Sequence, residues 1–190
     1  VAYAFLHLPL LILTLFSFNA SRFIVWEGFS LVWYRAAVRD PQLTETAVNS
    51  LVIAAVSTLT STVIGTMCAY GLWKRRSRFL AGGLYLSLVP PEIVLGVSLL
   101  AFFQGLFRFL NVQLGMHTVI LAHVSFSLAY VVLVVMARLR TMDATLEEAA
   151  MDLGATEWGA FRMVTLPALL PGVAAAALLA FTVSFDDYVI

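Results

Sequence analysis

Three residue types that often carry chemistry are scarce in this 190-residue sequence: cysteine, histidine and lysine. The single cysteine, Cys68, has no partner for an intrachain disulfide, and no thiolate cluster is present to hold a metal. Because it lies inside an apolar run, we expect Cys68 to pack among its neighbours. His7, His117 and His123 lie on separate segments without metal-ligand spacing, so we expect each to be structural and no metal to be bound.

The scarcity of lysine excludes ATP hydrolysis by this chain. The loop with which ATPases grip phosphate has the pattern Gly-x-x-x-x-Gly-Lys-Ser/Thr. The only lysine, Lys74, is preceded by Trp73 and followed by Arg75, so the pattern is absent. We therefore expect this chain to bind no cofactor and to hydrolyse no ATP.

Charged residues make up only 12% of the chain, and hydrophobic residues 62%, against the roughly 45–50% apolar share of soluble domains. The mean hydropathy is +0.96. Eleven basic residues balance eleven acidic ones, so the net charge points to no nucleic acid or acidic surface as a partner. This composition predicts a protein embedded in a lipid bilayer.

Five apolar segments reach or approach the length of a membrane span. A helix needs about twenty mostly apolar residues to cross the hydrocarbon, and backbone groups inside lipid must be satisfied within the span, so each is helical. The sequence predicts an all-α membrane bundle, one domain over residues 1–190, with spans at Ala2–Phe18, Leu51–Trp73, Phe79–Phe103, Thr118–Met136 and Ala168 to the end. Because the chain begins without methionine and stops inside an apolar segment, we expect it to be a fragment.

Basic residues beside the spans predict the orientation of the bundle, because short loops rich in Lys and Arg stay in the cytoplasm. Two segments are basic, one with Lys74, Arg75, Arg76 and Arg78, the other with Arg138, Arg140 and Arg162. We therefore expect the N-terminus and residues 137–167 to be cytoplasmic, and residues 19–49 and 104–117 to be external. Aromatic residues of the first external loop fit either an interfacial belt or a small packing surface: Trp26, Trp33 and Tyr34.

A polar stretch, Thr145 to Pro167, interrupts the apolar pattern between the fourth and fifth spans. Thr145 and Glu148 have the spacing of a capping box, which predicts that a short helix begins there. Gly154 is placed to end that helix, because glycine adopts the left-handed conformation freely. Thr156 can cap a second short helix, which we expect Pro167 to end.

The first of these short helices has the features of a docking element. Ala149 and Ala150 lack bulk, so another surface can approach closely, and we expect Glu147 and Glu148 to flank the contact. The alternative is an amphipathic helix on the inner lipid surface, but such helices carry a basic polar face, whereas this one is acidic. We therefore favour docking to a cytoplasmic protein. A channel or proton-coupled carrier would not need such a docking loop.

The spacing of the polar stretch resembles the EAA loop in the membrane subunits of ATP-binding-cassette importers. The pattern is Glu148-Ala149-Ala150, three residues, Gly154, nine residues, Val164, one residue and Leu166-Pro167, with valine where isoleucine is usual. The resemblance implies that residues 141–167 form the coupling loop, which seats in a groove of an ATPase subunit and transmits its closure to the pore. The residues it implies in this role are Glu147, Glu148, Ala149, Ala150, Gly154, Leu166 and Pro167.

Further stretches resemble one branch of that family, the PotC-like permeases of spermidine/putrescine importers: SFNASRF, GFSLVWY, NSLVIA, PPEIVLGVSLL and FTVSFDDYVI. The resemblance implies a type I, MetI-like permease bundle in the bacterial cytoplasmic (inner) membrane, with at least five transmembrane helices here and a sixth missing after Ile190. It implies three kinds of partner: a cytoplasmic pair of ATP-binding subunits, a second permease subunit and an extracytoplasmic solute-binding protein. It leaves open whether the solute is a polyamine or another small solute.

Three acidic residues inside apolar segments are candidates for a cation pathway, because a carboxylate within a bilayer is costly and usually faces a cavity or a partner. Glu92 directly follows Pro90 and Pro91, which should break the third span; alternatively, Glu92 bonds to neighbouring helices. Asp186 and Asp187 lie near the outer end of the fifth span and mark either the pathway or the interface. Their adjacency argues against an aspartyl protease, whose acids converge from separate elements. We hypothesise that the three acids favour polyamine cations.

Overall fold

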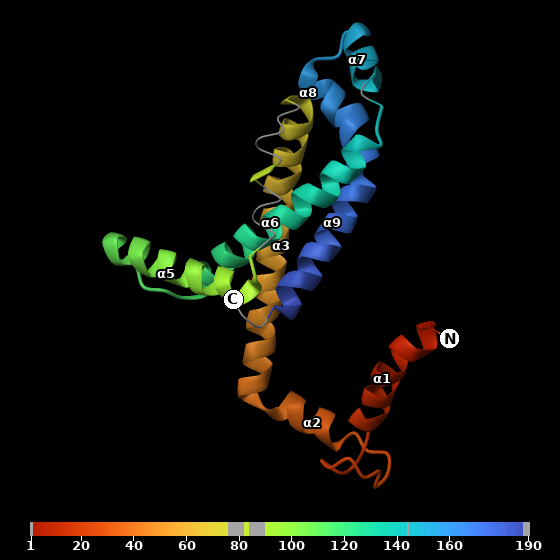
Figure 1. Cartoon of the computed structure of the whole chain (residues 1–190), viewed down its shortest axis with the longest axis vertical. Helices are drawn as coiled ribbons and strands as arrows, with labels where there is room; N and C mark the ends of the chain where they lie inside the picture. Colours follow the sequence, from red (N-terminus) through yellow and green to blue (C-terminus); the bar gives the residue numbers. More distant parts are fainter. Residues whose placement is uncertain (1, 76–81, 84–89, 144, 188–190) are drawn as a thin grey trace. The chain divides into compact units, whose positions relative to one another are not determined.

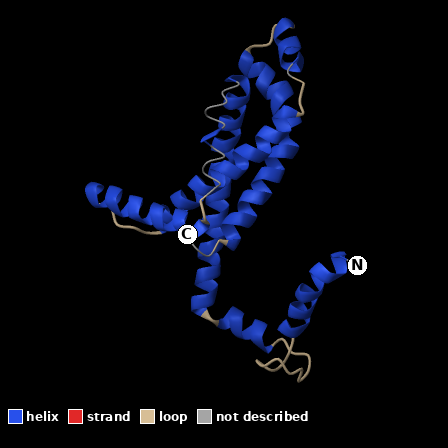
Figure 2. Ribbon diagram, in the orientation of Figure 1, coloured by secondary structure: helices blue, strands red, loops and turns tan. Residues whose placement is uncertain are grey.

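The computed structural model describes residues 2–75, 82–83, 90–143 and 145–187, and their regular structure is helical apart from one β-bridge between Asn19 and Phe29 (Figures 1 and 2). The predicted all-α fold is therefore confirmed over the described residues. The elements are α1 (Ala2–Ser17), α2 (Val32–Arg39), α3 (Pro41–Arg75), α5 (Glu92–Leu110), α6 (Met116–Arg140), α7 (Thr145–Asp152), α8 (Glu157–Ala160), the π-helical turn η1 (Phe161–Thr165) and α9 (Leu166–Asp186). They form two compact units, residues 1–49 and 50–190, and α3 contributes to both.

The first unit is organised by a buried asparagine in the loop between α1 and α2. Asn19 is 1% exposed, and its side-chain Nδ2 donates to the carbonyl oxygens of Phe23 and Val25 at 3.3 and 2.7 Å. Its Oδ1 accepts from the backbone N–H of Glu27 at 2.9 Å. One side chain thus satisfies three backbone groups that the loop does not pair within regular structure.

Aromatic side chains of the first unit pack around Asn19. The indole Nε1 of Trp33 donates to the Asn19 carbonyl at 3.1 Å. The Phe18 ring stacks on Phe29 and on Tyr34, with centroid distances of 5.2 and 5.4 Å. Of the two alternatives for the aromatic residues of this loop, the packing surface accounts for Trp33 and Tyr34.

Helices α3, α6 and α9 form the core of the second unit. Their buried apolar side chains pack in one cluster: Ala69, Val131, Val132, Val135, Leu139, Leu169, Ala176 and Ala180. Many apolar side chains on the outer faces of the helices are exposed, which suits helices whose solvent is lipid. Cys68 of α3 is exposed too. The packing predicted for it is therefore wrong, because no described residue covers it.

Small residues let the core helices approach closely. A Cβ atom added to Gly65 of α3 would lie 2.6 Å from Cγ1 of Val131 in α6. One added to Gly172 of α9 would lie 2.7 Å from the side chain of Arg138 in α6. Arg138 also donates from Nε and Nη2 to the Ala168 carbonyl, at 3.2 and 3.0 Å. The contact between α6 and α9 is therefore fixed both by packing and by two hydrogen bonds.

Among the described residues, four helical segments are long and apolar enough to cross a membrane: Pro41–Arg75, Ile93–Leu110, Met116–Arg140 and Glu157–Asp186. They overlap the second to fifth predicted spans, and residues 79–81 and 84–89 of the third lie outside the described residues. The first predicted span forms α1, an apolar helix of 16 residues that falls short of the same length.

Two helix ends differ from the prediction. Helix α3 begins at Pro41 rather than Leu51, because proline suits the first turn of a helix and Asp40 accepts hydrogen bonds from the amides that follow it. Helix α5 continues to Leu110, although the polar Gln104 was expected to open a loop. Asn111 directly follows as its C-cap, and its φ of 54° is the left-handed conformation common at helix C-termini.

Pro167 does not end a helix, contrary to the prediction. The chain stays helical from Glu157 to Asp186, through α8, η1 and α9 without interruption. Pro167 lies in the first turn of α9, directly after η1. The wider π-helical turn lies where the proline ring would otherwise crowd the preceding carbonyl groups, so the helix can continue.

The close approach of α3 and α6 predicts that alanine substitution destabilises the protein at one glycine of α3 and not at another. Gly65→Ala pushes a methyl group into Val131 and should cost roughly 1–3 kcal/mol of stability. Gly71→Ala meets nothing within 4 Å and should not destabilise the protein. Thermal unfolding of both variants in detergent measures the difference, and equal melting temperatures would contradict the packing described.

Candidate functional site

Helix α7 is capped by an acidic residue that precedes it. The Asp143 carboxylate accepts from the backbone N–H of Thr145 at 3.0 Å. This bond, together with one from the Thr145 side chain, holds the pKa of the Asp143 carboxyl below its usual value. The capping box predicted for Thr145 and Glu148 is wrong, because Thr145 already belongs to the first turn of the helix and bonds back to Asp143.

Gly154 ends α7 as predicted. Its φ is +92°, a conformation that side-chain-bearing residues rarely adopt. The Gly154 N–H donates to the Met151 carbonyl at 2.9 Å, and the Ala155 N–H donates to the Ala150 carbonyl at 3.1 Å. This pair of bonds is the Schellman motif of helix C-termini. Thr156 then caps α8 with its side chain, which confirms the predicted second helix.

The outward face of α7 combines small and apolar side chains that the described residues leave uncovered. Leu146 and Leu153 are 53% and 90% exposed. Glu148 and Ala149 are exposed, and Ala150 is half-buried. Figure 1 shows α7 at one end of the second unit, beyond the ends of α3 and α9. This surface is open to another protein.

Glu147 points the other way. It is 5% exposed, and its Oε1 accepts from the hydroxyl of Tyr70 and lies 3.4 Å from the Lys74 ammonium. Both partners belong to α3. The prediction that Glu147 flanks the docking surface beside Glu148 is therefore wrong, because successive helical residues point about 100° apart and this one faces the bundle.

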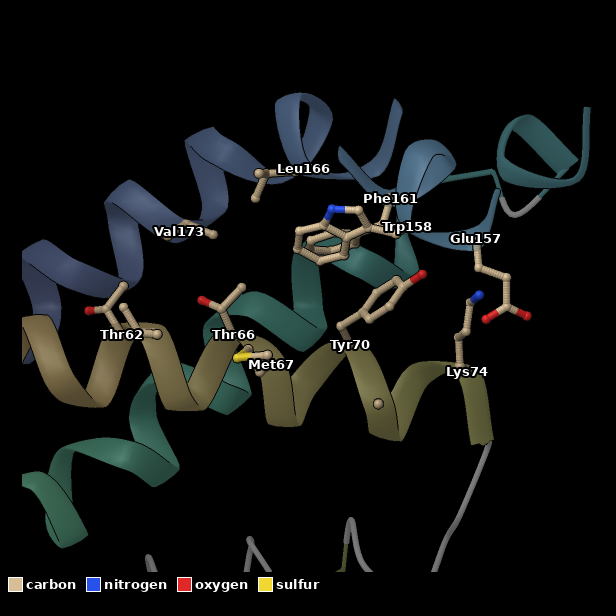
Figure 3. A pocket seen from close by; sticks show the side chains of 12 residues that line it. Thr62, Thr66, Met67, Tyr70, Lys74, Glu157, Trp158, Phe161, Leu166 and Val173 are labelled. Carbon is tan, nitrogen blue, oxygen red and sulfur yellow. The ribbon is translucent and has the colours of Figure 1, made fainter. Parts of the chain in front are cut away.

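A mostly apolar cavity of about 650 Å³ lies between α3 and the segment from α8 to α9 (Figure 3). Tyr70, Trp158 and Phe161 contribute aromatic rings to its wall, and Lys74 lies at one end of it. Leu166, which the sequence assigned to the coupling loop, lines this cavity rather than the outward face of α7.

The three acids of the predicted cation pathway lie at helix ends. Helix α5 begins at Glu92, directly after Pro91. The residues before the prolines, 84–89, and the Glu92 side chain lie outside the described residues, so the break predicted at the prolines stays a prediction. Asp186 is the last residue of α9 and is exposed. Asp187 directly follows it and is half-buried. The pathway role of the three acids stays a prediction.

A buried polar chain joins the three core helices. His123 Nδ1 of α6 and the Ser184 hydroxyl of α9 are 2.8 Å apart, and the Ser184 and Ser57 hydroxyls are 2.9 Å apart, with Ser57 on α3. All three residues are at most 5% exposed. The sequence did not group them, although polar residues inside apolar spans are a known signal of function. Which of them meet depends on how the helices pack.

Comparison with known proteins finds a matching protein family and several similar permeases. Residues 61–190 match the protein family described as "Binding-protein-dependent transport system inner membrane component". The chain is 40% identical over 192 residues to the spermidine/putrescine transport system permease protein PotC of Escherichia coli (strain K12), covering 99% of this chain and 71% of that protein. It is 39% identical over 194 residues to the Haemophilus influenzae PotC protein, covering 100% and 74%. Identity to the E. coli (strain K12) putrescine transport system permease protein PotI is 40% over 197 residues, covering 100% and 70%.

The cap on α7 predicts a pH dependence of its local stability. Because the pKa of Asp143 is lowered in the folded chain, the cap stabilises α7 fully above the ordinary value of about 3.9 and is lost as the pH falls through the folded-state pKa. Asp143→Ala should speed amide hydrogen exchange in α7 at neutral pH, whereas Asp40→Ala, at the start of α3, should not. Unchanged exchange in Asp143→Ala would show that the cap is unimportant.

Proposed function

The chain belongs to the family of inner-membrane components of binding-protein-dependent transport systems, and we propose that it forms one half of the translocation pathway of an ATP-driven polyamine importer. It lies beside a second permease subunit and above a pair of cytoplasmic ATPase subunits. An extracytoplasmic binding protein delivers the solute. This chain binds no cofactor, and the ATPase pair uses the ATP.

The observation that carries this proposal is the uncovered outward face of α7. Its apolar and small side chains Leu146, Ala149 and Ala150, together with Leu153 directly after the helix, suit insertion into a groove of another protein. Its ends are set by Asp143 and Gly154. A helix held at both ends can receive the movement of an ATPase and pass it to the membrane helices.

The basic residues support a cytoplasmic location for α7. Lys74 and Arg75 lie in the last turn of α3, and Arg138 and Arg140 lie in the last turn of α6. Because Glu147 of α7 contacts Lys74, α7 lies at the same basic end of the bundle. Short basic segments stay in the cytoplasm. With α1 as a fifth span, the N-terminus is cytoplasmic as well.

Polyamines are the proposed solutes for two reasons. The relatives are named as spermidine/putrescine and putrescine transport permeases. Polyamines are also polycations, and the chain places Glu92 at the start of α5 and Asp186 and Asp187 at the end of α9. Carboxylates that line a pathway of low dielectric attract cations strongly.

The coupling role of α7 predicts a severe effect at Gly154. Gly154→Val forces a β-branched residue to a φ of +92°, a strain of about 1–3 kcal/mol, and should reduce ATP-dependent uptake about tenfold or more while membrane insertion stays intact. Gly154→Asn should retain more uptake, because asparagine tolerates positive φ better. Uptake in membrane vesicles measures both, and normal uptake by Gly154→Val would count against the coupling role.

The acidic pathway predicts a loss of polyamine uptake when its charges are removed. Glu92→Gln, Asp186→Asn and Asp187→Asn combined should raise the KM for spermidine roughly tenfold, which corresponds to about 1.4 kcal/mol of lost attraction. Glu45→Gln, which removes an exposed charge from α3, serves as the control. Spermidine uptake that is unchanged in the assembled triple variant would exclude the cation pathway.

A further inference from the structure

The contact between α7 and α3 indicates how movement enters this subunit. We propose that Glu147 is a positioning residue that fixes α7 to the end of α3, so that the two helices move as one body during transport. The inference rests on the proposed function, in which α7 receives the movement of an ATPase. It assigns Glu147 to the interior of this subunit, whereas Glu148 is exposed.

The surroundings of Glu147 favour one position of its carboxylate. The residue has lost nearly all of its contact with solvent, and a buried carboxylate needs charged or hydrogen-bonding partners. Tyr70 supplies the hydroxyl and Lys74 the positive charge, and both lie on one face of α3, four residues apart. Moving α7 away from α3 would break the hydrogen bond from Tyr70 and the ion pair with Lys74, so both contacts oppose separation of the two helices.

Aromatic packing also fixes Tyr70, one of the two partners of Glu147. The Tyr70 ring lies 4.6 Å from the ring of Phe161 in η1, and Phe161 stacks on Trp158 of α8 at 5.4 Å (Figure 3). The Lys74 ammonium lies 5.4 Å from the centroid of the Tyr70 ring, a favourable position for a cation over an aromatic face. The partners of Glu147 are therefore themselves fixed in place.

Helix α3 makes a second polar contact deeper in the bundle. The Ser57 hydroxyl is hydrogen-bonded to Ser184 of α9, which is hydrogen-bonded to His123 of α6. Ser57 lies about 20 Å along α3 from Tyr70 at 1.5 Å per residue. A displacement of α7 that is passed to α3 thus reaches α6 and α9, the helices that carry His123 and Ser184.

The test uses the full-length protein in proteoliposomes with its second permease, ATPase pair and binding protein, and it measures spermidine taken up per ATP hydrolysed. Glu147→Gln keeps the size of the side chain but cannot pair with Lys74. We expect the uptake per ATP to fall about tenfold or more while the complex assembles and ATP is still hydrolysed. Glu45→Gln should leave the ratio unchanged. An unchanged ratio in assembled Glu147→Gln would overturn the proposal.

A covalent link between α7 and α3 in place of the ion pair tests whether Glu147 acts by positioning α7 or only by stabilising the fold. Lys74→Cys with Glu147→Cys, in a Cys68→Ser background, removes the ion pair and allows a short bismaleimide to link α7 to α3. We expect low uptake per ATP before linking and recovery toward the wild-type ratio after it, because the helices need not separate. A linked protein that assembles and hydrolyses ATP but still fails to transport would contradict the proposal.

Failure of the proposed function gives a different result from failure of this inference. If the chain is not an ATP-driven permease, the wild-type assembly takes up no solute in an ATP-dependent manner. If only the inference fails, the wild type transports and Glu147→Gln transports equally well per ATP.

Discussion

The position of α7 depends on one ion pair, between the buried Glu147 carboxylate and the exposed Lys74 ammonium, completed by the Tyr70 hydroxyl. A helix of eight residues is not stable alone in water, so an exposed one of this length must be held by the rest of the fold. Asp143 and Gly154 define its ends, and Glu147 attaches it to α3. The outward side chains of α7 can therefore be uncovered and still be presented in a fixed orientation.

The second unit is held together by close approach rather than by a large apolar core. Lipid is as apolar as the helix surfaces, so small residues and polar contacts must provide the association. Gly65 and Gly172 let α3 and α9 come close to α6, and Arg138 bonds across to α9. The chain from His123 through Ser184 to Ser57 joins the same helices inside the bundle. The three helices are thereby joined by polar contacts as well as by close packing.

Some signals that act within a few residues predicted the structure, although the capping box at Thr145 did not form, and contacts between distant segments did not follow from the sequence. Gly154 and Thr156 act as predicted because a C-cap glycine and an N-cap threonine bond only to nearby amides. The helix end predicted at Pro167 is wrong because the π-helical turn before it lets the helix continue. Glu147 was placed on the wrong side of α7 because the sequence could not show that Tyr70 and Lys74 lie opposite it. The meeting of His123, Ser184 and Ser57 depends on helix packing in the same way.

The central claim is that this subunit converts the work of an ATPase, received through α7, into movement of a polyamine across the membrane. The most direct measurement reconstitutes the full-length protein with its ATPase pair, second permease and binding protein, and follows uptake of labelled spermidine and putrescine beside an amino acid and an inorganic anion. The account predicts uptake of the polyamines that requires ATP. Uptake of a different solute would contradict the acidic pathway, and the absence of ATP dependence with every solute would contradict coupling through α7.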